Sequence, residues 1–352
     1  MDEAPDEFEW VFGIPQLVKE ERMLPELWRL TAHHRRSCPP YDRLMASIDA
    51  PASGTLLDVP WIPVRLFKDH VLRSIDESEV FRRLTSSGTT GADVSKIDLD
   101  AAAAQRQARA LSRTMQQVLG PQRLPMLVVD SKAVVRGTSY SARGAGVLGM
   151  MNFGRRHAFA LDDEMRLDID TVRRFLDDVG DQPFLMFGFT FMVWQYLSHL
   201  RDGEIDLSNG VLVHSGGWKK LIDQAVSPAD FRDHFRATTG LTRIHNFYGM
   251  VEQIGTVFLE SPDGDGSLTC PAFGDVIVRD PLTFRPLPDG EVGLLQLVSL
   301  LPTSYPGHSV LTEDLGRIEG VDDTARLGKR FTVVGRLPRA EARGCSDTFA
   351  AA

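Results

Sequence analysis

A short run of hydroxyl side chains and glycines is the part of this 352-residue sequence with the clearest chemical meaning. Glycine lets the backbone approach an anion closely, and successive backbone N–H groups in such a turn form an anion-binding nest. No lysine follows either glycine at the spacing of a Walker A loop, so that motif is excluded. The run predicts a phosphate-binding loop, and the alternative is a plain surface turn. Its members are Ser86, Ser87, Gly88, Thr89, Thr90 and Gly91.

Four further blocks accompany this loop in a fixed order. Residues 59–68 (VPWIPVRLFK) precede it, and residues 245–253 (HNFYGMVEQ), 311–317 (LTEDLGR) and 335–347 follow it. Together the blocks resemble the adenylate-forming enzymes, and in particular the LuxE-type acyl-protein synthetases. Each block alone is a weak signal, whereas their order along most of the chain is specific.

The resemblance implies an AMP-forming acid–thiol ligase that uses ATP and Mg²⁺. Such an enzyme activates a carboxylic acid, in this family a fatty acid, to an acyl-adenylate. It then passes the acyl group to a protein cysteine for delivery to a partner such as an acyl reductase. Two alternatives stay open: a ligase that uses coenzyme A or a carrier protein as acceptor, and a non-catalytic partner subunit with a nucleotide fold. A serine hydrolase is disfavoured because no G-x-S-x-G elbow occurs.

The family motifs assign roles to individual residues. Tyr248 and Gly249 match the aromatic-glycine pair beside adenine, and Glu252 matches the ligand of Mg²⁺, which favours one or two carboxylates plus phosphate oxygens. Asp314 matches the ribose anchor, because an ionised carboxylate can accept from both hydroxyls. Arg336 is expected to reach ribose or phosphate, or else to be an ordinary surface arginine.

A double glycine after an expected strand forms a second candidate site. Gly216 and Gly217 allow close approach of a flat ligand, and similar residues of the family lie near adenine. Trp218 is either part of that site or plain core. Lys219 is a candidate for the cation near the α-phosphate, although a solvated lysine is the more common outcome.

Cys345 is the candidate acyl acceptor. It follows Arg339 and Arg343, and nearby cations together with exposure favour the thiolate. A thiolate that attacks an acyl-adenylate forms a thioester, and in the resembled family a C-terminal cysteine carries the acyl group. The alternative is an incidental cysteine in a tail.

The expected fold is α/β, equivalent to the large N-terminal domain of adenylate-forming enzymes, with largely parallel strands flanked by helices. We expect one domain over residues 1–335, with the α/β core to about 270, a β-rich subdomain over 271–335, and a tail at 336–352. The family's usual C-terminal domain, with its catalytic lysine, is not expected. Local signals predict a helix capped by Asp98 or Asp100 and another that opens with Ser227 and Pro228.

Composition narrows the classes of partner. The formal net charge of −9 argues against nucleic-acid binding, which requires a surplus of Lys and Arg. No secretory signal and no apolar stretch long enough to span a membrane occur, and three scattered cysteines without a zinc spacing suit a reduced cytoplasm. We therefore expect a cytoplasmic protein that takes a carboxylic acid and meets an acyl reductase or carrier protein.

Overall fold

One large mixed sheet organises the part of the chain that the structure describes. This computed structural model describes residues 8–85, 94–136 and 142–337. Twelve of the described strands form one sheet in the order β11-β12-β13-β14-β10-β9-β8-β7-β6-β4-β5, with β1 beside β13, while β2 and β3 form a separate hairpin. The strands are β1 Ile62–Pro63, β2 Arg82–Thr85, β3 Lys96–Leu99, β4 Leu124–Ser131, β5 Gly154–Leu161, β6 Phe184–Phe189, β7 Gly210–Ser215, β8 Arg243–Tyr248, β9 Phe258–Glu260, β10 Leu268–Thr269, β11 Gly274–Arg279, β12 Gly293–Ser299, β13 Ser309–Val321 and β14 Lys329–Arg336.

The helices form where the chain offers local start signals. Asp100 accepts a hydrogen bond from the N–H of Ala103 at 2.7 Å and begins α4, and Ser227 accepts from the N–H of Asp230 at 3.1 Å and begins α8. Both predicted starts are confirmed, with Asp100 rather than Asp98 as the cap. The helices are α1 Gln16–Ser37, α2 Pro39–Ser47, α3 Leu66–Asp69, α4 Ala101–Leu119, α5 Ala142–Met151, α6 Ile169–Val179, α7 Thr190–Leu197 and α8 Pro228–Thr239.

The sheet has a parallel half and an antiparallel half. Strands β4 to β8 pair in parallel, with helices in the connections between them, as the sequence pattern predicts for an α/β fold. From β8 onward the pairing is antiparallel through β9, β10, β14, β13, β12 and β11. The predicted α/β class is confirmed. The strands after residue 270 continue the same sheet, and the proposed domain boundaries stay a prediction.

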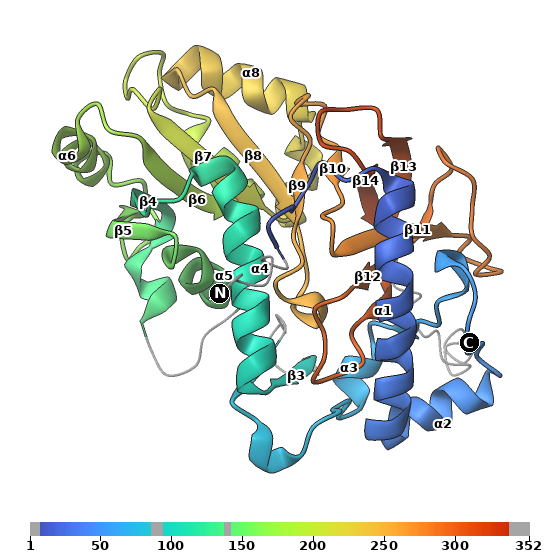
Figure 1. Ribbon diagram of the computed structural model, residues 1–352. Coiled ribbons are helices and arrows are strands. Elements are labelled where there is room, and N and C mark those ends of the chain that lie inside the picture. The colour runs from blue at the N-terminus through green and yellow to red at the C-terminus, as the bar shows by residue number, and fades with distance from the viewer. Residues whose placement is uncertain (1–7, 86–93, 137–141, 338–352) are drawn as a thin grey trace, which may run out of the picture.

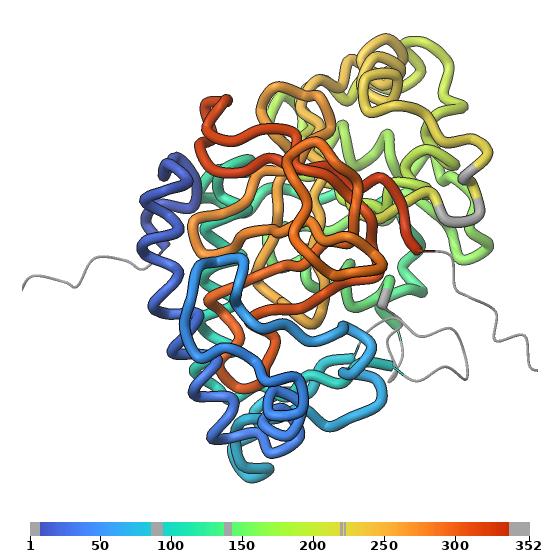
Figure 2. Tube along the Cα trace, turned by 90° about the vertical axis from the view of Figure 1, so that its right-hand side faces the viewer, coloured from blue at the N-terminus to red at the C-terminus, as the bar shows by residue number. Residues whose placement is uncertain are grey.

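The N-terminal region packs on the antiparallel half. Figures 1 and 2 show the blue helix α1 beside the orange and red strands at the end of the chain. A buried ionic contact holds it there, because the Lys19 ammonium lies 3.1 Å from the Asp275 carboxylate, which Lys329 also approaches at 3.3 Å. Burial raises the pKa of Asp275, but these two cations outweigh burial and lower it to about 2.

The longest apolar stretch is core. Residues 184–197 form β6 and α7, and Phe184, Phe187 and Val193 are buried. Among the described residues, no helix combines the length and the apolar character needed to cross a membrane.

Several histidines are held neutral inside this fold. The rings of His34 and His308 stack with centroids 5.0 Å apart, and hydrogen bonds of 2.8 Å to Ser74 and 2.9 Å to Thr31 hold them. Burial is the largest cause that lowers the pKa of these rings, and neighbouring positive groups add to it. The pKa of His34 lies well below its usual value. The pKa values of His308 and His214 fall to about 3, and that of His245 falls to about 4.

These histidines predict a loss of stability in mild acid. In the unfolded chain these histidines take up protons below about pH 6.5, whereas in the folded chain they stay neutral until about pH 3–4. Their contribution to the free energy of unfolding is therefore fully present above pH 6.5 and falls as the pH drops below it. Each histidine contributes about 1.4 kcal/mol per pH unit within its window. Urea unfolding at pH 7.5, 6.5 and 5.5 measures the slope, with salt held constant. Equal stability at the three values would contradict the prediction.

Candidate functional site

Three predicted site residues meet between β8 and the β13–β14 pair. The Tyr248 hydroxyl donates to Asp314 Oδ2 at 2.7 Å, and Arg336 Nε lies 3.8 Å from Asp314 Oδ1. Asp314 and Arg336 are cross-strand partners, and Arg336 also forms a 2.6 Å ion pair with Glu313. Tyr248 lies 66 residues before Asp314 and 88 residues before Arg336 in the sequence, so the convergence of the three residues is a property of the fold.

The Tyr248 ring has a fixed place. It packs on Phe258 and Phe331, with ring centroids 6.2 Å away in both cases. Burial and the Asp314 carboxylate raise the pKa of Tyr248 well above its usual value, so the phenol keeps its proton and donates it. One oxygen of Asp314 is thereby held, and a quarter of its side chain remains exposed.

Glu252 lies one short turn beyond β8. It belongs to the 3₁₀ turn η5 (Val251–Gln253), and only 5% of the residue is exposed. Burial raises the pKa of its carboxyl, while the nearby Ser95 hydroxyl and the charges of Lys68 and Arg336 act in the opposite direction. No group of three or more His, Cys, Asp or Glu able to hold a metal occurs in the described part of the chain. A single carboxylate suits Mg²⁺, which takes its other ligands from water and phosphate oxygens.

The predicted phosphate loop, Ser86–Gly91, lies outside the described residues, but the strands on both sides of it are described. Strand β2 ends at Thr85 and β3 begins at Lys96, and the two pair antiparallel. Asp98 clamps them, because it accepts from Arg83 Nε at 2.5 Å and Nη2 at 2.9 Å, and from Arg73 at 3.1 Å.

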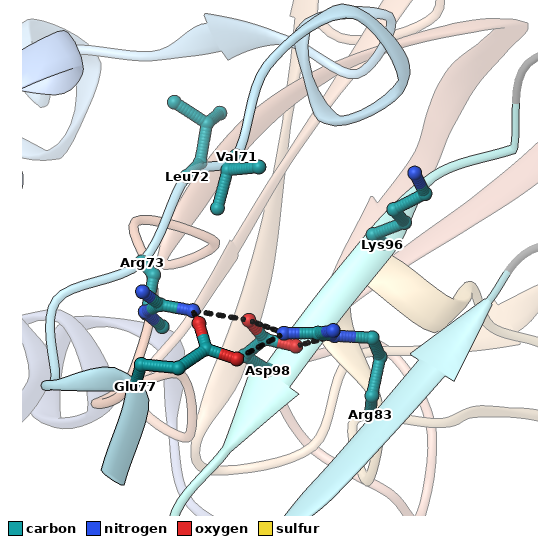
Figure 3. A pocket seen from close by; sticks show the side chains of 7 residues that line it. All are labelled: Val71, Leu72, Arg73, Glu77, Arg83, Lys96 and Asp98. Carbon is teal, nitrogen blue, oxygen red and sulfur yellow. Dashed lines mark hydrogen bonds and ion pairs between the residues drawn. The ribbon is translucent and has the colours of Figure 1, made fainter. Parts of the chain in front are cut away.

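Figure 3 shows both guanidinium groups directed at this buried carboxylate. They line a pocket of about 320 Å³ beside the hairpin. The neighbouring charges hold the pKa of Asp98 below its usual range, with the Arg83 hydrogen bonds as the largest cause. The two strands that flank the loop are therefore joined to each other and to Arg73 through Asp98.

The double glycine follows the strand next to β8. Gly216 and Gly217 are exposed at the end of β7, and Gly216 has φ +84°, a conformation that glycine adopts without strain. Trp218 is half-buried, and its ring contacts Trp194 edge-on at 5.7 Å and Phe231 at 6.5 Å. The structure thus packs Trp218 beside core aromatics at the carboxyl edge of the parallel strands, where ligands of α/β proteins bind. Lys219 begins the next turn, and its side chain lies outside the described part.

Two of the three cysteines lie in the described part of the chain. Cys38 and Cys270 are buried, and burial raises the pKa of both thiols, that of Cys270 to about 12. Neither is suited to supply a thiolate at neutral pH. Cys345 lies outside the described residues, and its role stays a prediction.

Sequence reasoning missed the residues that support the site. Lys68 and Ser95 act on Glu252, and Asp98 clamps the hairpin, but none was singled out as a site residue. Lys68 closes the family-like block 59–68, and Ser95 follows the phosphate loop, so the motifs contained both residues without indicating their roles.

Comparisons with known proteins identify relatives of the chain. Long-chain-fatty-acid–luciferin-component ligases of Aliivibrio fischeri and Vibrio harveyi are similar to the chain. The first is 23% identical over 316 residues, or 84% of this chain and 79% of the relative. The second is 24% identical over 310 residues, or 83% of this chain and 77% of the relative.

Solved structures share the fold. A 2-hydroxyisobutyryl-CoA ligase in an open conformation, in complex with 2-HIB-AMP and CoA, superposes with a TM-score of 0.68 at 17% identity, covering 96% of this chain and 80% of that one. ATP-bound MatB from Rhodopseudomonas palustris gives a TM-score of 0.50 at 17% identity, covering 75% of this chain and 49% of that one. The predicted adenylate-forming fold is confirmed.

The family assignment rests on nearly the whole length of the chain. The five sequence blocks, in their order, predict a LuxE-type protein, and the structure joins two of them at Tyr248 and Asp314. The model of the family described as "Acyl-protein synthetase, LuxE" matches residues 15–352, and the chain therefore belongs to the LuxE acyl-protein synthetase family.

Proposed function

We propose that this protein activates a long-chain fatty acid with ATP and passes the acyl group, through an acyl-adenylate, to a cysteine thiol. The observation that carries the proposal is the contact of Tyr248, Asp314 and Arg336, with Glu252 one turn away. Membership of the acyl-protein synthetase family supports the type of reaction. The names of the two relatives support the class of acid.

Asp314 is the anchor for the ribose of the nucleotide. A carboxylate has about four acceptor positions, of which Tyr248 occupies one, so positions remain for the two ribose hydroxyls. The Tyr248 hydrogen bond fixes the rotation of the carboxylate before the nucleotide arrives. Pre-organisation of this kind lowers the cost of binding, because fewer side-chain rotations are lost.

Glu252 would hold Mg²⁺ at the phosphates. The ion supplies charge neutralisation when it is bound. The burial of Glu252 strengthens its interaction with any cation, because the local dielectric is low. The Ser95 hydroxyl and the charges of Lys68 and Arg336 favour the ionised form of this carboxyl.

The first reaction joins two anions. An oxygen of the fatty-acid carboxylate forms a bond to the α-phosphorus, the bond to the bridging oxygen breaks, and pyrophosphate leaves with the electron pair. The protein contributes position and charge stabilisation to this step. In the second reaction a thiolate attacks the acyl carbon and AMP leaves.

Cys345 is our candidate for that thiolate. Its support comes from the other two cysteines, whose burial and raised thiol pKa values make them poor nucleophiles. An acyl reductase or carrier protein would then receive the acyl group from Cys345.

Fatty-acid-dependent exchange between ATP and pyrophosphate tests the first reaction. We expect exchange with long-chain acids that requires Mg²⁺, and a loss of at least about 100-fold in Glu252→Gln, because the charge that holds the ion is removed. Glu291→Gln, at an exposed position, is the matched control and should keep full activity. A wild-type protein that binds ATP but shows no exchange with any acid in a broad panel would refute the proposal.

Tyr248→Phe tests the anchor separately. The variant keeps the ring and removes the hydrogen bond to Asp314, and hydrogen bonds to charged groups contribute about 1.5–3 kcal/mol. We expect KM for ATP to rise about tenfold or more, with a smaller change in kcat. Tyr196→Phe is the control. An unchanged KM would mean that the ribose does not depend on this pair.

Cys345→Ser separates the two half-reactions. Exchange should persist, because adenylation does not need the thiol, while stable acyl loading should almost vanish, because a serine hydroxyl is protonated at neutral pH. Labelled fatty acid with ATP, followed by hydroxylamine treatment, measures the thioester, and Cys38→Ala serves as control. Equal label on Cys345→Ser and wild type would move the acceptor elsewhere, and rapid transfer to added coenzyme A without any protein label would favour the external-thiol ligase.

A further inference from the structure

Two pockets of different character lie next to each other in the N-terminal region, and both are lined by Val71 and Leu72. The charged pocket, of about 320 Å³, is the one beside the β2–β3 hairpin. The apolar pocket, of about 420 Å³, is lined by residues of α2, β1 and α3. Figure 3 shows Val71 and Leu72 on one side of the charged pocket and Lys96 on the other. Both volumes fall in the range of small-molecule sites, about 300–1,000 Å³.

The apolar pocket offers aliphatic and aromatic side chains. Three of its residues, Tyr41, Ile62 and Leu72, are also members of a buried hydrophobic cluster, so core packing fixes their positions. Its two basic residues, Arg43 and His70, are exposed, and their polar groups therefore stay in water. This pocket suits an apolar chain. The lining without basic residues is Pro40, Tyr41, Leu44, Ile62, Leu66, Val71 and Leu72.

The charged pocket has one positive charge without a counterpart. Asp98 accepts hydrogen bonds from the guanidinium groups of Arg73 and Arg83, and Glu77 forms ion pairs with the same two groups. Two carboxylates therefore match two guanidinium groups. Lys96 also lines the pocket, and it forms no ion pair with any residue that the structure describes. The pocket is thus complementary to a ligand group with a single negative charge.

This uncompensated cation lies at the base of the predicted phosphate loop. Lys96 is the cross-strand partner of Thr85, the last residue of β2, and Arg83 pairs with Asp98 two positions further from the loop. Side chains two residues apart on a strand point to the same face, so Lys96 and the Arg83–Asp98 pair face the same pocket. An anion held at Lys96 would lie at the end of the hairpin nearest the loop.

We propose that the two pockets together bind the fatty-acid substrate, with its carboxylate at Lys96 and its chain passing Val71 and Leu72 into the apolar pocket. This inference rests on the proposed adenylation and adds the place where the acid binds. A fatty acid carries one negative charge at one end of an apolar chain, which matches one uncompensated ammonium beside an apolar lining. A nucleotide phosphate chain carries several charges and no apolar part, so it matches this pair of pockets less well.

The dependence of affinity on chain length tests the position of the chain. Calorimetry without ATP, over the saturated acids from hexanoate to dodecanoate, should show affinity rising about fourfold with each methylene. Val71 is 61% exposed, so Val71→Trp is compatible with folding. Its indole should keep two or more methylenes out of the apolar pocket, which flattens the rise and weakens dodecanoate binding at least about tenfold. Val292→Trp, at another exposed valine, is the matched control and should keep the wild-type slope.

The charge of the ligand tests the position of the carboxylate. Lys96→Met should weaken the binding of every acid by the same factor, about tenfold, and leave the chain-length slope unchanged. Binding of dodecanol should not change, because the alcohol has no charge. Arg43→Met, which removes the exposed cation of the apolar pocket, is the control and should bind acids as the wild type does. A thermal melt checks that every variant folds.

Each part of the assignment has a result that overturns it. A wild-type slope in Val71→Trp would remove the chain from the apolar pocket. Equal weakening of dodecanoate and dodecanol in Lys96→Met, or a larger effect of Arg43→Met than of Lys96→Met, would remove the carboxylate from Lys96. Because these measurements omit ATP, a protein that binds acids as expected but supports no pyrophosphate exchange would refute the proposed function alone. Exchange with a wild-type KM for dodecanoate in both Val71→Trp and Lys96→Met would refute this inference alone.

Discussion

The hydrogen bond between Tyr248 and Asp314 joins two strands that are not neighbours in the sheet. Between β8 and β13 lie β9, β10 and β14, and β9 and β10 are only three and two residues long. Tyr248, the last residue of β8, pairs with Phe258 of β9, and its hydroxyl reaches a carboxylate 66 residues further along the chain. This hydrogen bond is one of the polar contacts between the parallel and antiparallel halves of the sheet, and the predicted residues Arg336 and Glu252 lie near it.

Positive side chains act on the carboxylate near this contact, although the chain as a whole is acidic. The net charge is −9, yet Lys68 and Arg336 both act on the buried Glu252. A buried carboxylate is destabilised unless it is protonated or compensated by positive charge. Positive charges near a buried carboxylate suit a ligand that carries both a divalent cation and several phosphate charges.

Two further ionic contacts hold the segments that position the site. Asp275 with Lys19 and Lys329 attaches α1 to the antiparallel half, and Asp98 with Arg83 joins the two strands of the hairpin. The Lys19–Asp275 pair is fully buried, and removing one partner of such a pair leaves an uncompensated charge, which costs about 3–5 kcal/mol. Both contacts hold backbone segments together: the first attaches α1 to the sheet, and the second joins the strands that flank the predicted phosphate loop.

The sequence alone determined the family, the α/β class and the local starts of helices. Helix caps such as Asp100 and Ser227 are readable because the donor and the acceptor lie three residues apart. The order of the motif blocks predicted the residues of a nucleotide site, since each block keeps its own spacing. Only the tertiary structure decided which of these residues touch. The contacts of Tyr248 with Asp314 and of Phe67 with Tyr305 join residues far apart in sequence, and the effect of Lys68 on Glu252 depends on burial. Neither long-range pairing nor burial has a local signature, because both depend on how the halves of the sheet close on each other.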